Sequence, residues 1–311
     1  MLLRLRPGDY GRLFSEGIEP EPAPPPAALR LRRRAAFREN LKTRAQRLVR
    51  VAARFLRPRR IADLPATFDL LLRDHRVKSG QPADPHDALP SADGLVRLAA
   101  DLTPASMMEA YGAGLSPSAC LGPVAWHSRA RRLVAPPSDL VEASIPELAD
   151  VDAEWTVAFD RDADFVLASS GRPPDHSAIM PARLLAGFAE LFDTGFAHSF
   201  EVRDAAGKAI GGGFGVAVGG VFVLEGGFEI NSGAARFGLS HLARRLGEWS
   251  FSLVECAPGA AWLNAGGFEP VPRDEFLSLV ARHTSEKKYG RWRDDEDDTA
   301  PQETPRSRLA A

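Results

Sequence analysis

Two glutamates stand at the ends of apolar runs, where a carboxylate can take part in chemistry. Glu225 directly follows the run 221–224, and Glu255 lies within the run 252–256. A carboxylate placed in this way can accept a proton or hold an ammonium group. It can equally be a solvated or salt-bridged group with no part in any reaction. The residues themselves leave both interpretations open.

Other catalytic and binding patterns do not form in the sequence. The seven histidines show no H-x-x-x-H or similar spacing, and Cys120 and Cys256 give neither a zinc set nor a disulfide framework. Ser199 has no G-x-S-x-G elbow around it, and its neighbour His198 is expected to make a structural hydrogen bond. The glycine-rich run 211–215 lacks G-x-G-x-x-G and lies inside a predicted hairpin, which rejects a dinucleotide loop. We therefore expect no metal and no cofactor.

The elements that position the two glutamates are the clearest in the chain. The runs 210–218 and 221–224 meet at Gly219-Gly220, which predicts a hairpin. A strand over residues 252–256 is predicted after a helix with Ser232 as its N-cap. The apolar residues of that helix recur at spacings of 4, 3, 4 and 3, which places them on one face: Ala235, Leu239, Leu242, Leu246 and Trp249. A β-β-α-β unit of this kind predicts an α/β or α+β domain.

Charge is distributed unevenly along the 311 residues, although the net charge is only −2. Between Arg30 and Arg60 there are 12 arginines and one lysine against a single acid, Glu39, and residues 294–298 are all acidic. Residues 29–56 are predicted to form one basic amphipathic helix that ends before Pro58. A row of guanidinium groups can neutralise nucleic-acid phosphates, whereas a docked surface helix or a membrane-surface helix would show the same pattern. Candidate RNA contacts on this segment are Arg33, Arg44 and Arg47, and Arg131 and Arg132 extend the set.

Composition and length exclude several classes of protein. No apolar run approaches the roughly 18 residues of a membrane span, and the first residues lack the apolar core of a signal peptide. Few cysteines fit a reducing compartment. We expect a cytoplasmic protein of one or two domains, a monomer with no membrane partner.

Six blocks, in collinear order over roughly residues 94–277, resemble the leucyl/phenylalanyl-tRNA–protein transferase family. GLVRLAADLTPASMMEAYGAGL and VAWHSRARRLV resemble its first two blocks, and GFAHSFEV is similar to its AHSVEV strand. GGGFGVAVGGVFVLEGGF follows its GG-x-YGVA…GESMF hairpin, LVECA stands where the family has LIDCQ, and PRDEF resembles its closing IPR block.

The resemblance implies an N-acetyltransferase-like (GNAT) acyltransferase domain preceded by a smaller domain. We expect a Pro-rich and basic helical extension with a linker over residues 1–92, and the small N-terminal domain over 93–153. The GNAT-like domain is expected over 154–284 and a disordered acidic tail over 285–311.

The resemblance also implies a reaction. An aminoacyl-tRNA would donate Leu, Phe or a related residue to the α-amine of a protein or peptide that begins with Arg or Lys, which marks that protein for degradation. Glu255, at the family's Asp, is the expected catalytic residue. Ala257 replaces the family's Gln and can neither accept a proton nor hold an ammonium. Expected substrate-binding positions are Glu225, Gly227 (at the family's Met), Phe228, Trp126 and Ala257.

Two other functions stay open at this point. A GNAT-type acyl-CoA N-acyltransferase would need a polar residue to lead the Gly-x-Gly/Ala turn at its helix start, and Ile230-Asn231-Ser232-Gly233-Ala234-Ala235 supplies the Gly and Ala but not that residue. An RNA-binding paralogue with a decayed active site would explain Ala257, and also Ala178 at a position where the family carries a tryptophan.

Overall fold

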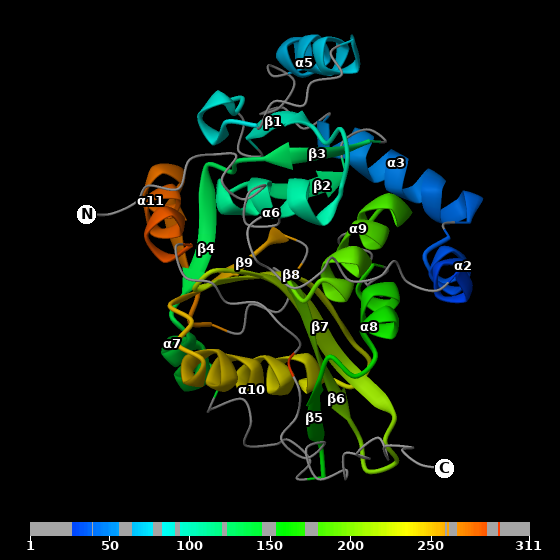
Figure 1. Ribbon diagram of the computed structural model, residues 1–311, viewed down its shortest axis with the longest axis vertical. Coiled ribbons are helices and arrows are strands. Elements are labelled where there is room, and N and C mark those ends of the chain that lie inside the picture. Colours follow the sequence, from blue (N-terminus) through cyan, green and yellow to red (C-terminus); the bar gives the residue numbers. More distant parts are fainter. Residues whose placement is uncertain are drawn as a thin grey trace, which may run out of the picture.

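The computed structural model describes residues 27–38, 40–55, 64–76, 83–90, 94–119, 123–144, 154–171, 180–258, 260, 266–284 and 292. Two β-sheets organise these residues (Figure 1). The larger has seven strands in the order β10-β4-β9-β8-β7-β6-β5. Its strands are β4 (Arg131–Ala135), β5 (Thr156–Phe159), β6 (Ala197–Arg203), β7 (Ala209–Val218), β8 (Val221–Glu229), β9 (Leu253–Cys256) and β10 (Glu269–Pro272). Only the neighbours β8 and β9 run parallel; every other neighbouring pair in this sheet is antiparallel.

The predicted hairpin, helix and strand are confirmed. β7 and β8 are joined at Gly219, whose φ of +59° favours a residue without a side chain. Helix α10 (Ala234–Glu248) then leads to β9. The predicted N-cap is wrong by one residue: Gly233 occupies that position with φ +84° and offers no side-chain hydrogen bond. Its left-handed backbone turns the chain into the helix, and this requirement is met by Gly233 rather than by Ser232.

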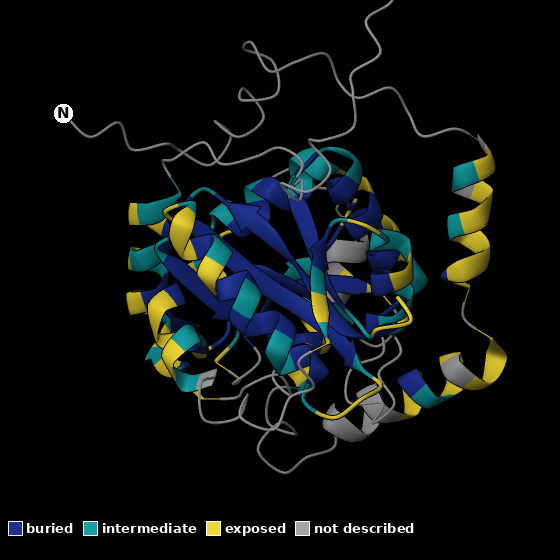
Figure 2. Cartoon of the chain, turned by 90° about the horizontal axis from the view of Figure 1, so that it is seen from below, coloured by how far each residue is buried: buried dark blue, intermediate teal, exposed yellow. Residues whose placement is uncertain are grey.

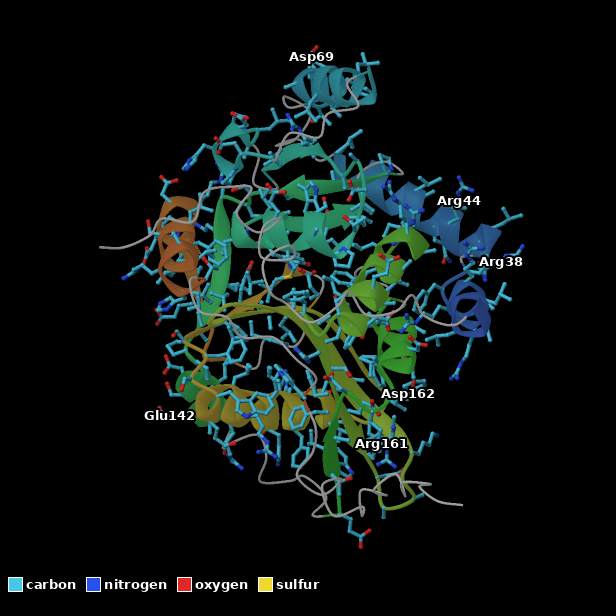
Figure 3. All side chains as sticks on the ribbon, viewed as in Figure 1. Arg38, Arg44, Asp69, Glu142, Arg161 and Asp162 are labelled. Carbon is cyan, nitrogen blue, oxygen red and sulfur yellow. The ribbon has the colours of Figure 1, made fainter. Side chains whose placement is uncertain are left out.

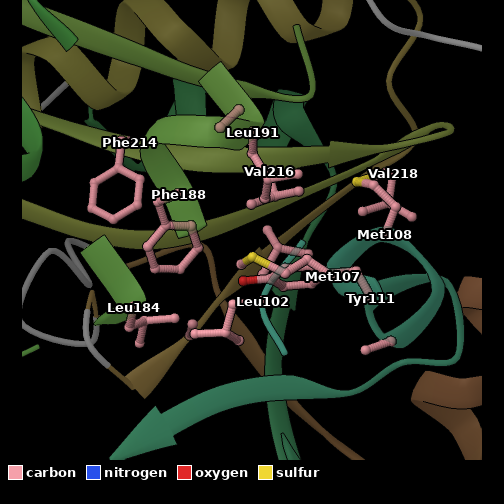
Figure 4. Close-up of a cluster of buried hydrophobic side chains, with 14 of the residues drawn as sticks. Leu102, Met107, Met108, Tyr111, Leu184, Phe188, Leu191, Phe214, Val216 and Val218 are labelled. Carbon is pink, nitrogen blue, oxygen red and sulfur yellow. The ribbon is translucent and has the colours of Figure 1, made fainter. Parts of the chain in front are cut away.

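Helices cover both faces of the larger sheet (Figure 1). On one face lie α10 and α7 (Pro137–Ser144), and on the other lie α8 (Ala163–Ser170), α9 (Ala182–Asp193) and α6 (Pro104–Gly112). The predicted apolar stripe of α10 packs against side chains such as Phe222 and Val254. The opposite face holds a second core of aliphatic, aromatic and methionine side chains from α6, α9 and β7 (Figure 4). The strands between these two cores are buried almost throughout (Figure 2).

The smaller sheet has three strands in the order β1-β3-β2: β1 (Leu95–Leu98), β2 (Ser116–Ala119) and β3 (Val124–His127). Helix α6 begins after Thr103, whose hydroxyl accepts a hydrogen bond from the Ser106 amide, as its Thr-Pro start predicts. Helix α5 (Leu64–Arg76) contacts β1, and the short helix η1 (Pro85–Asp87) lies between α5 and β1 in the sequence. Helix α11 (Arg273–His283) packs beside β4 and β10. Between His127 and Arg131 the chain passes from the smaller sheet to the larger one, because β3 belongs to the first and β4 to the second. The predicted domain division at residues 153 and 154 stays a prediction.

The basic segment is two helices, α2 (Ala27–Ala36) and α3 (Leu41–Phe55), and the prediction of one helix is wrong. The chain turns at Phe37, which is buried, while Leu41 is 86% exposed. The apolar positions of the predicted helix therefore do not share one buried face. The apolar periodicity does not show this break, because contacts with distant parts of the chain cause it. Phe37 packs into the core formed with α6, α9 and β7, and Arg33 binds acidic side chains of α8 and α9.

Of the predicted linker, residues 78–92, the structure describes 83–90. The predicted Pro-rich segment 19–27 lies outside the described residues except for Ala27, and the predicted acidic tail 285–311 lies outside them except for Trp292. Trp292 is the described residue of that tail. Its ring stacks on His198 with centroids 3.9 Å apart and packs near Phe222, Trp249 and Phe251.

Candidate active site

The parallel strands β8 and β9 stop pairing at the place where the two glutamates lie. Their register runs from Val221 opposite Leu253 to Leu224 opposite Cys256. Glu225 follows immediately on β8, and it is the extra residue of a β-bulge, because Phe214 pairs with Gly226 and Gly215 pairs with Leu224. Bulges bend a strand and redirect side chains, and they are frequent beside active sites.

Glu255 is held by Arg132 from the adjacent strand β4. The guanidinium donates to Glu255 Oε1 from both Nε and Nη2, and the side chains are only 2% and 1% exposed. Arg132 also donates to the Gly114 carbonyl over 2.9 Å and lies 4.2 Å from the ring centroid of Phe276. Glu255 Oε2 is buried and accepts no hydrogen bond from any part of the chain that the structure describes. One carboxylate oxygen is therefore fixed, and the other is buried without a hydrogen-bond partner among the described residues.

Glu225 is held by Tyr111 from α6. The phenol donates a hydrogen bond of 2.7 Å to Glu225 Oε1. The Tyr111 ring in turn meets Trp126 edge to face, with centroids 6.3 Å apart. Trp126 of β3 is 4% exposed. Strand β3 of the smaller sheet and helix α6 together place Trp126 and Tyr111 over the face of the larger sheet that carries both glutamates.

Burial raises the pKa of three side chains of the site, Glu225, Glu255 and Cys256. It raises the pKa of Glu225 to about 8, against the opposing effects of the Tyr111 hydrogen bond and the nearby guanidinium groups. Burial also raises the pKa of Glu255, and the charge and hydrogen bonds of Arg132 counteract this. The pKa of the Cys256 thiol rises to about 12, mainly by burial, so this cysteine is no nucleophile at neutral pH. A carboxyl that exchanges its proton near neutral pH, as Glu225 does, is suited to acid–base work.

The other predicted substrate-binding positions lie on the same two strands. Phe228 is 3% exposed and meets Phe165 of α8 edge to face, with centroids 5.5 Å apart. Gly227 pairs with Gly213 across the hairpin. Ala257 follows β9, is 1% exposed and donates its amide to the Leu224 carbonyl over 2.9 Å. The structure therefore brings the predicted positions of β8 and β9 together, although their roles stay predictions.

The candidate RNA contacts are scattered. Arg44 and Arg131 are exposed, and Arg44 lies at the edge of the molecule (Figure 3). Arg47 is 7% exposed. Arg33 donates to Asp164 over 2.7 Å and to both oxygens of Asp193 over 2.6 and 2.9 Å, so its guanidinium joins α2 to α8 and α9. With Arg132 buried against Glu255, the five residues do not form one surface, and their contact with RNA stays a prediction.

Two residues of the site were not assigned to it from the sequence. Nothing in the sequence marks Tyr111 as a site residue, and the basic residues around Arg132 place it among the candidate RNA contacts. They meet their glutamates across 114 and 123 residues of chain. No local spacing can show such pairs. The expectation for His198 is confirmed, since its Nδ1 lies 2.8 Å from Asp160 Oδ2.

Neither a membrane span nor a metal cluster occurs in the described ranges. None of the helices seen there is both long and apolar enough to cross a bilayer. The same residues contain no group of three or more His, Cys, Asp or Glu side chains that could hold a metal ion.

The fold and the site define a mixed α/β protein consistent with an acyltransferase-like fold, with two buried glutamates where parallel strands separate. Residues 147–281 match the sequence profile of the leucyl/phenylalanyl-tRNA protein transferases. The chain is 33% identical over 202 residues to the leucyl/phenylalanyl-tRNA–protein transferase of Teredinibacter turnerae, covering 64% of this chain and 78% of that protein. It is 32% identical over 199 residues to the protein of that name from Thiobacillus denitrificans, covering 62% and 86%. The chain belongs to the leucyl/phenylalanyl-tRNA–protein transferase family.

Proposed function

We propose that this protein transfers an amino acid from an aminoacyl-tRNA to the N-terminal α-amine of a protein, in the cytoplasm and as a monomer. The donor residue would be Leu, Phe or a related side chain, and the acceptor a chain that begins with Arg or Lys. The observation that carries the proposal is Glu255, a buried carboxylate with one oxygen bound by Arg132 and the other unoccupied by any described group, in a member of this family.

The reaction is aminolysis of an ester. The α-amine nitrogen attacks the ester carbonyl carbon, a peptide bond forms, and the bond between that carbon and the ribose oxygen breaks. The attacking amine loses a proton, and the ribose oxygen gains one as it leaves. An α-amine has a pKa near 8, so a sizeable fraction is already neutral at pH 7. The protein mainly has to position the two substrates and carry one proton.

Glu255 is suited to carry this proton. Arg132 fixes its Oε1, which leaves Oε2 to accept the proton of the attacking amine and return it to the leaving ribose oxygen. Ala257 cannot share this task, because a methyl group neither donates nor accepts a hydrogen bond. We propose that Glu255, one methylene longer than the aspartate of the family pattern, works without the amide that the pattern places at residue 257.

Glu225 is suited to hold the cationic side chain of the acceptor. Its pKa of about 8 means that it keeps a proton at neutral pH while the site is empty. A guanidinium or ammonium beside it would favour the ionised form and lower its pKa, so binding an Arg or Lys side chain would release a proton. The hydrogen bond from Tyr111 would remain through this change, because an ionised carboxylate accepts it more strongly.

The donor would lie along the same strands. Phe228 and the glycines beside it are proposed to receive the apolar donor side chain, and Trp126 to contact the terminal adenosine. In this proposal residues 93–153 and 154–284 divide these tasks between the small domain and the transferase domain. The glycine at residue 227 in place of methionine leaves more room for the donor side chain than the family pattern would.

The direct test uses labelled Leu-tRNA or Phe-tRNA with peptides that begin with Arg, Lys or Ala. The proposal expects the Arg and Lys peptides to be lengthened by the labelled residue and the Ala peptide to be unchanged. Retained tRNA binding without transfer would instead support an RNA-binding paralogue. Transfer from acetyl-CoA to an amine, in the absence of tRNA, would support an acyl-CoA transferase.

A further inference from the structure

Helices α2 and α3 turn arginines toward the body of the protein and aliphatic side chains toward solvent. Arg33 of α2 binds two carboxylates of the main body, and Arg47 of α3 is buried. Leu41 and Val49 of α3 are 86% and 67% exposed, and Leu31 of α2 is exposed as well. A surface helix ordinarily turns its apolar stripe to the core and its charges to water. The orientation of α2 and α3 is the reverse of this.

The exposed face of α3 is an apolar stripe with a basic residue on each side. An α-helix turns by about 100° per residue, so the apolar side chains described as exposed on α3 fall within an arc of roughly 100°: Leu48, Leu41, Ala45 and Val49. Arg44 lies beside one border of this arc and Lys42 beside the other, and both are exposed. The buried Arg47 lies about 150° from the middle of the arc. The stripe therefore points away from the side on which α3 is buried.

The shorter helix α2 repeats this arrangement. Arg33 faces the body, and Leu31 lies about 160° away from it around the helix. Arg32 and Arg34 each lie about 100° from Arg33, on opposite sides of it, and both are exposed. We call the exposed residues of the two helices that share this pattern the outer face. It consists of Leu31, Leu41, Ala45, Leu48 and Val49 together with Arg32, Arg34, Lys42 and Arg44.

The charge and the apolar content of the outer face distinguish between possible partners. Neither helix contains an aspartate or a glutamate. A nucleic acid would pair with the basic residues but would leave the aliphatic side chains in water. A second copy of this face would bring like charges together. An anionic lipid surface fits both parts, because aliphatic side chains enter the boundary between headgroups and acyl chains while lysine and arginine reach the phosphates.

We propose that the outer face of α2 and α3 binds the surface of a lipid bilayer that contains anionic headgroups. Its aliphatic side chains enter the boundary below the headgroups, and its basic residues bind the lipid phosphates on either side. The expectation of no membrane partner rests on the lack of a spanning segment, and a helix that lies on the surface needs none. Arg33 keeps α2 joined to the body in this contact. The contact does not depend on the proposed transferase function.

Co-sedimentation of the full chain with lipid vesicles tests the proposal. Vesicles of phosphatidylcholine mixed with phosphatidylglycerol should bind the protein at least about tenfold more tightly than vesicles of phosphatidylcholine alone, because the anionic headgroups attract the basic residues. Raising the salt should weaken this binding. Failure to bind the anionic vesicles would overturn the proposal and would leave an acidic protein as the partner of the outer face.

A matched pair of double variants separates entry of the apolar stripe from adsorption by charge alone. Leu41→Gln with Val49→Gln removes the two most exposed large apolar side chains described on α3 and keeps its charge and its helix propensity. Phe68→Gln with Leu72→Gln removes two exposed apolar side chains from α5, where Asp69 lies beside them (Figure 3). Circular dichroism checks that both variants keep their helices.

The two variants should differ in the vesicle assay. The α3 variant should bind anionic vesicles at least about tenfold more weakly than the unaltered protein, because it has lost apolar area that would leave water. The α5 variant should bind them as tightly as the unaltered protein. Equal binding by the α3 and α5 variants would contradict the proposal, because the aliphatic side chains of α3 would then play no part in the contact.

Discussion

Arg132 and Glu255 form an ion pair in which neither side chain reaches solvent, with exposures of 2% and 1%. A buried pair of this kind gains little over apolar packing, but it is costly to break, because the remaining charge has no partner. Arg132 therefore has two effects on Glu255. It fixes the direction of the carboxylate, and it holds the pKa of Glu255 below the value that burial alone would give.

Arg132→Met removes the positive charge beside Glu255 while it keeps a long side chain at this position. We expect a loss of about 3–5 kcal/mol in the free energy of unfolding, because Glu255 is left buried and unpaired. The pKa of Glu255 should rise, since its positive partner is gone. The double variant with Glu255→Gln should recover part of the stability in urea denaturation. Additive losses in this cycle would show that the two residues do not interact.

Stability should depend on pH through Glu225. The folded protein keeps a proton on this carboxyl up to a pKa of about 8, whereas the unfolded chain releases it near the ordinary value of 4.5. Between these two values the folded state binds more protons, so its stability falls as pH rises, by at most about 1.4 kcal/mol per pH unit. Glu225→Gln should flatten the curve of unfolding free energy against pH relative to the unaltered protein. Parallel curves would mean that Glu225 titrates normally.

Tyr111→Phe should move the pKa of Glu225 upward. The phenol hydrogen bond favours the ionised carboxylate, so its removal makes ionisation harder. The unmade bond should cost about 1–3 kcal/mol in stability. Carboxyl NMR of labelled glutamate follows the titration directly. Ser240→Ala, which removes a buried hydroxyl bonded to the Phe237 carbonyl over 2.8 Å, serves as the control, and its Glu225 titration should match that of the unaltered protein. A Tyr111→Phe titration curve that matches this control would rule out the proposed coupling.

The fold was predictable to the extent that it depends on local pattern. The β7–β8 hairpin follows from two apolar runs joined at Gly219-Gly220, and α10 follows from its 4, 3, 4, 3 spacing. The break between α2 and α3 was not predictable, because it depends on the burial of Phe37 and on carboxylates far along the chain. The same holds for the candidate site. Glu225 and Glu255 are recognisable in the sequence at the ends of apolar runs, whereas their partners Tyr111 and Arg132 are recognisable only once the sheets are assembled.

Arg33 should act as the attachment point of α2. Arg33→Ala removes a guanidinium bound to two carboxylates, whereas the neighbouring Arg34→Ala removes one that is exposed. We expect the first variant to increase hydrogen exchange and proteolysis within α2 and α3, at a cost of roughly 1–3 kcal/mol for a charge-assisted pair. The second should leave both unchanged. Equal protection in the two variants would show that other contacts hold the helices.

The most direct test of the account replaces Glu255 in the transfer assay with charged tRNA and an Arg-initiated peptide. Glu255→Gln keeps the shape of the side chain but removes its ability to accept the amine proton. We expect the transfer rate to fall by about 100-fold or more, with tRNA binding unchanged, and Glu255→Asp to keep measurable activity. A transfer rate for Glu255→Gln within twofold of the unaltered protein would contradict the role assigned to this carboxylate.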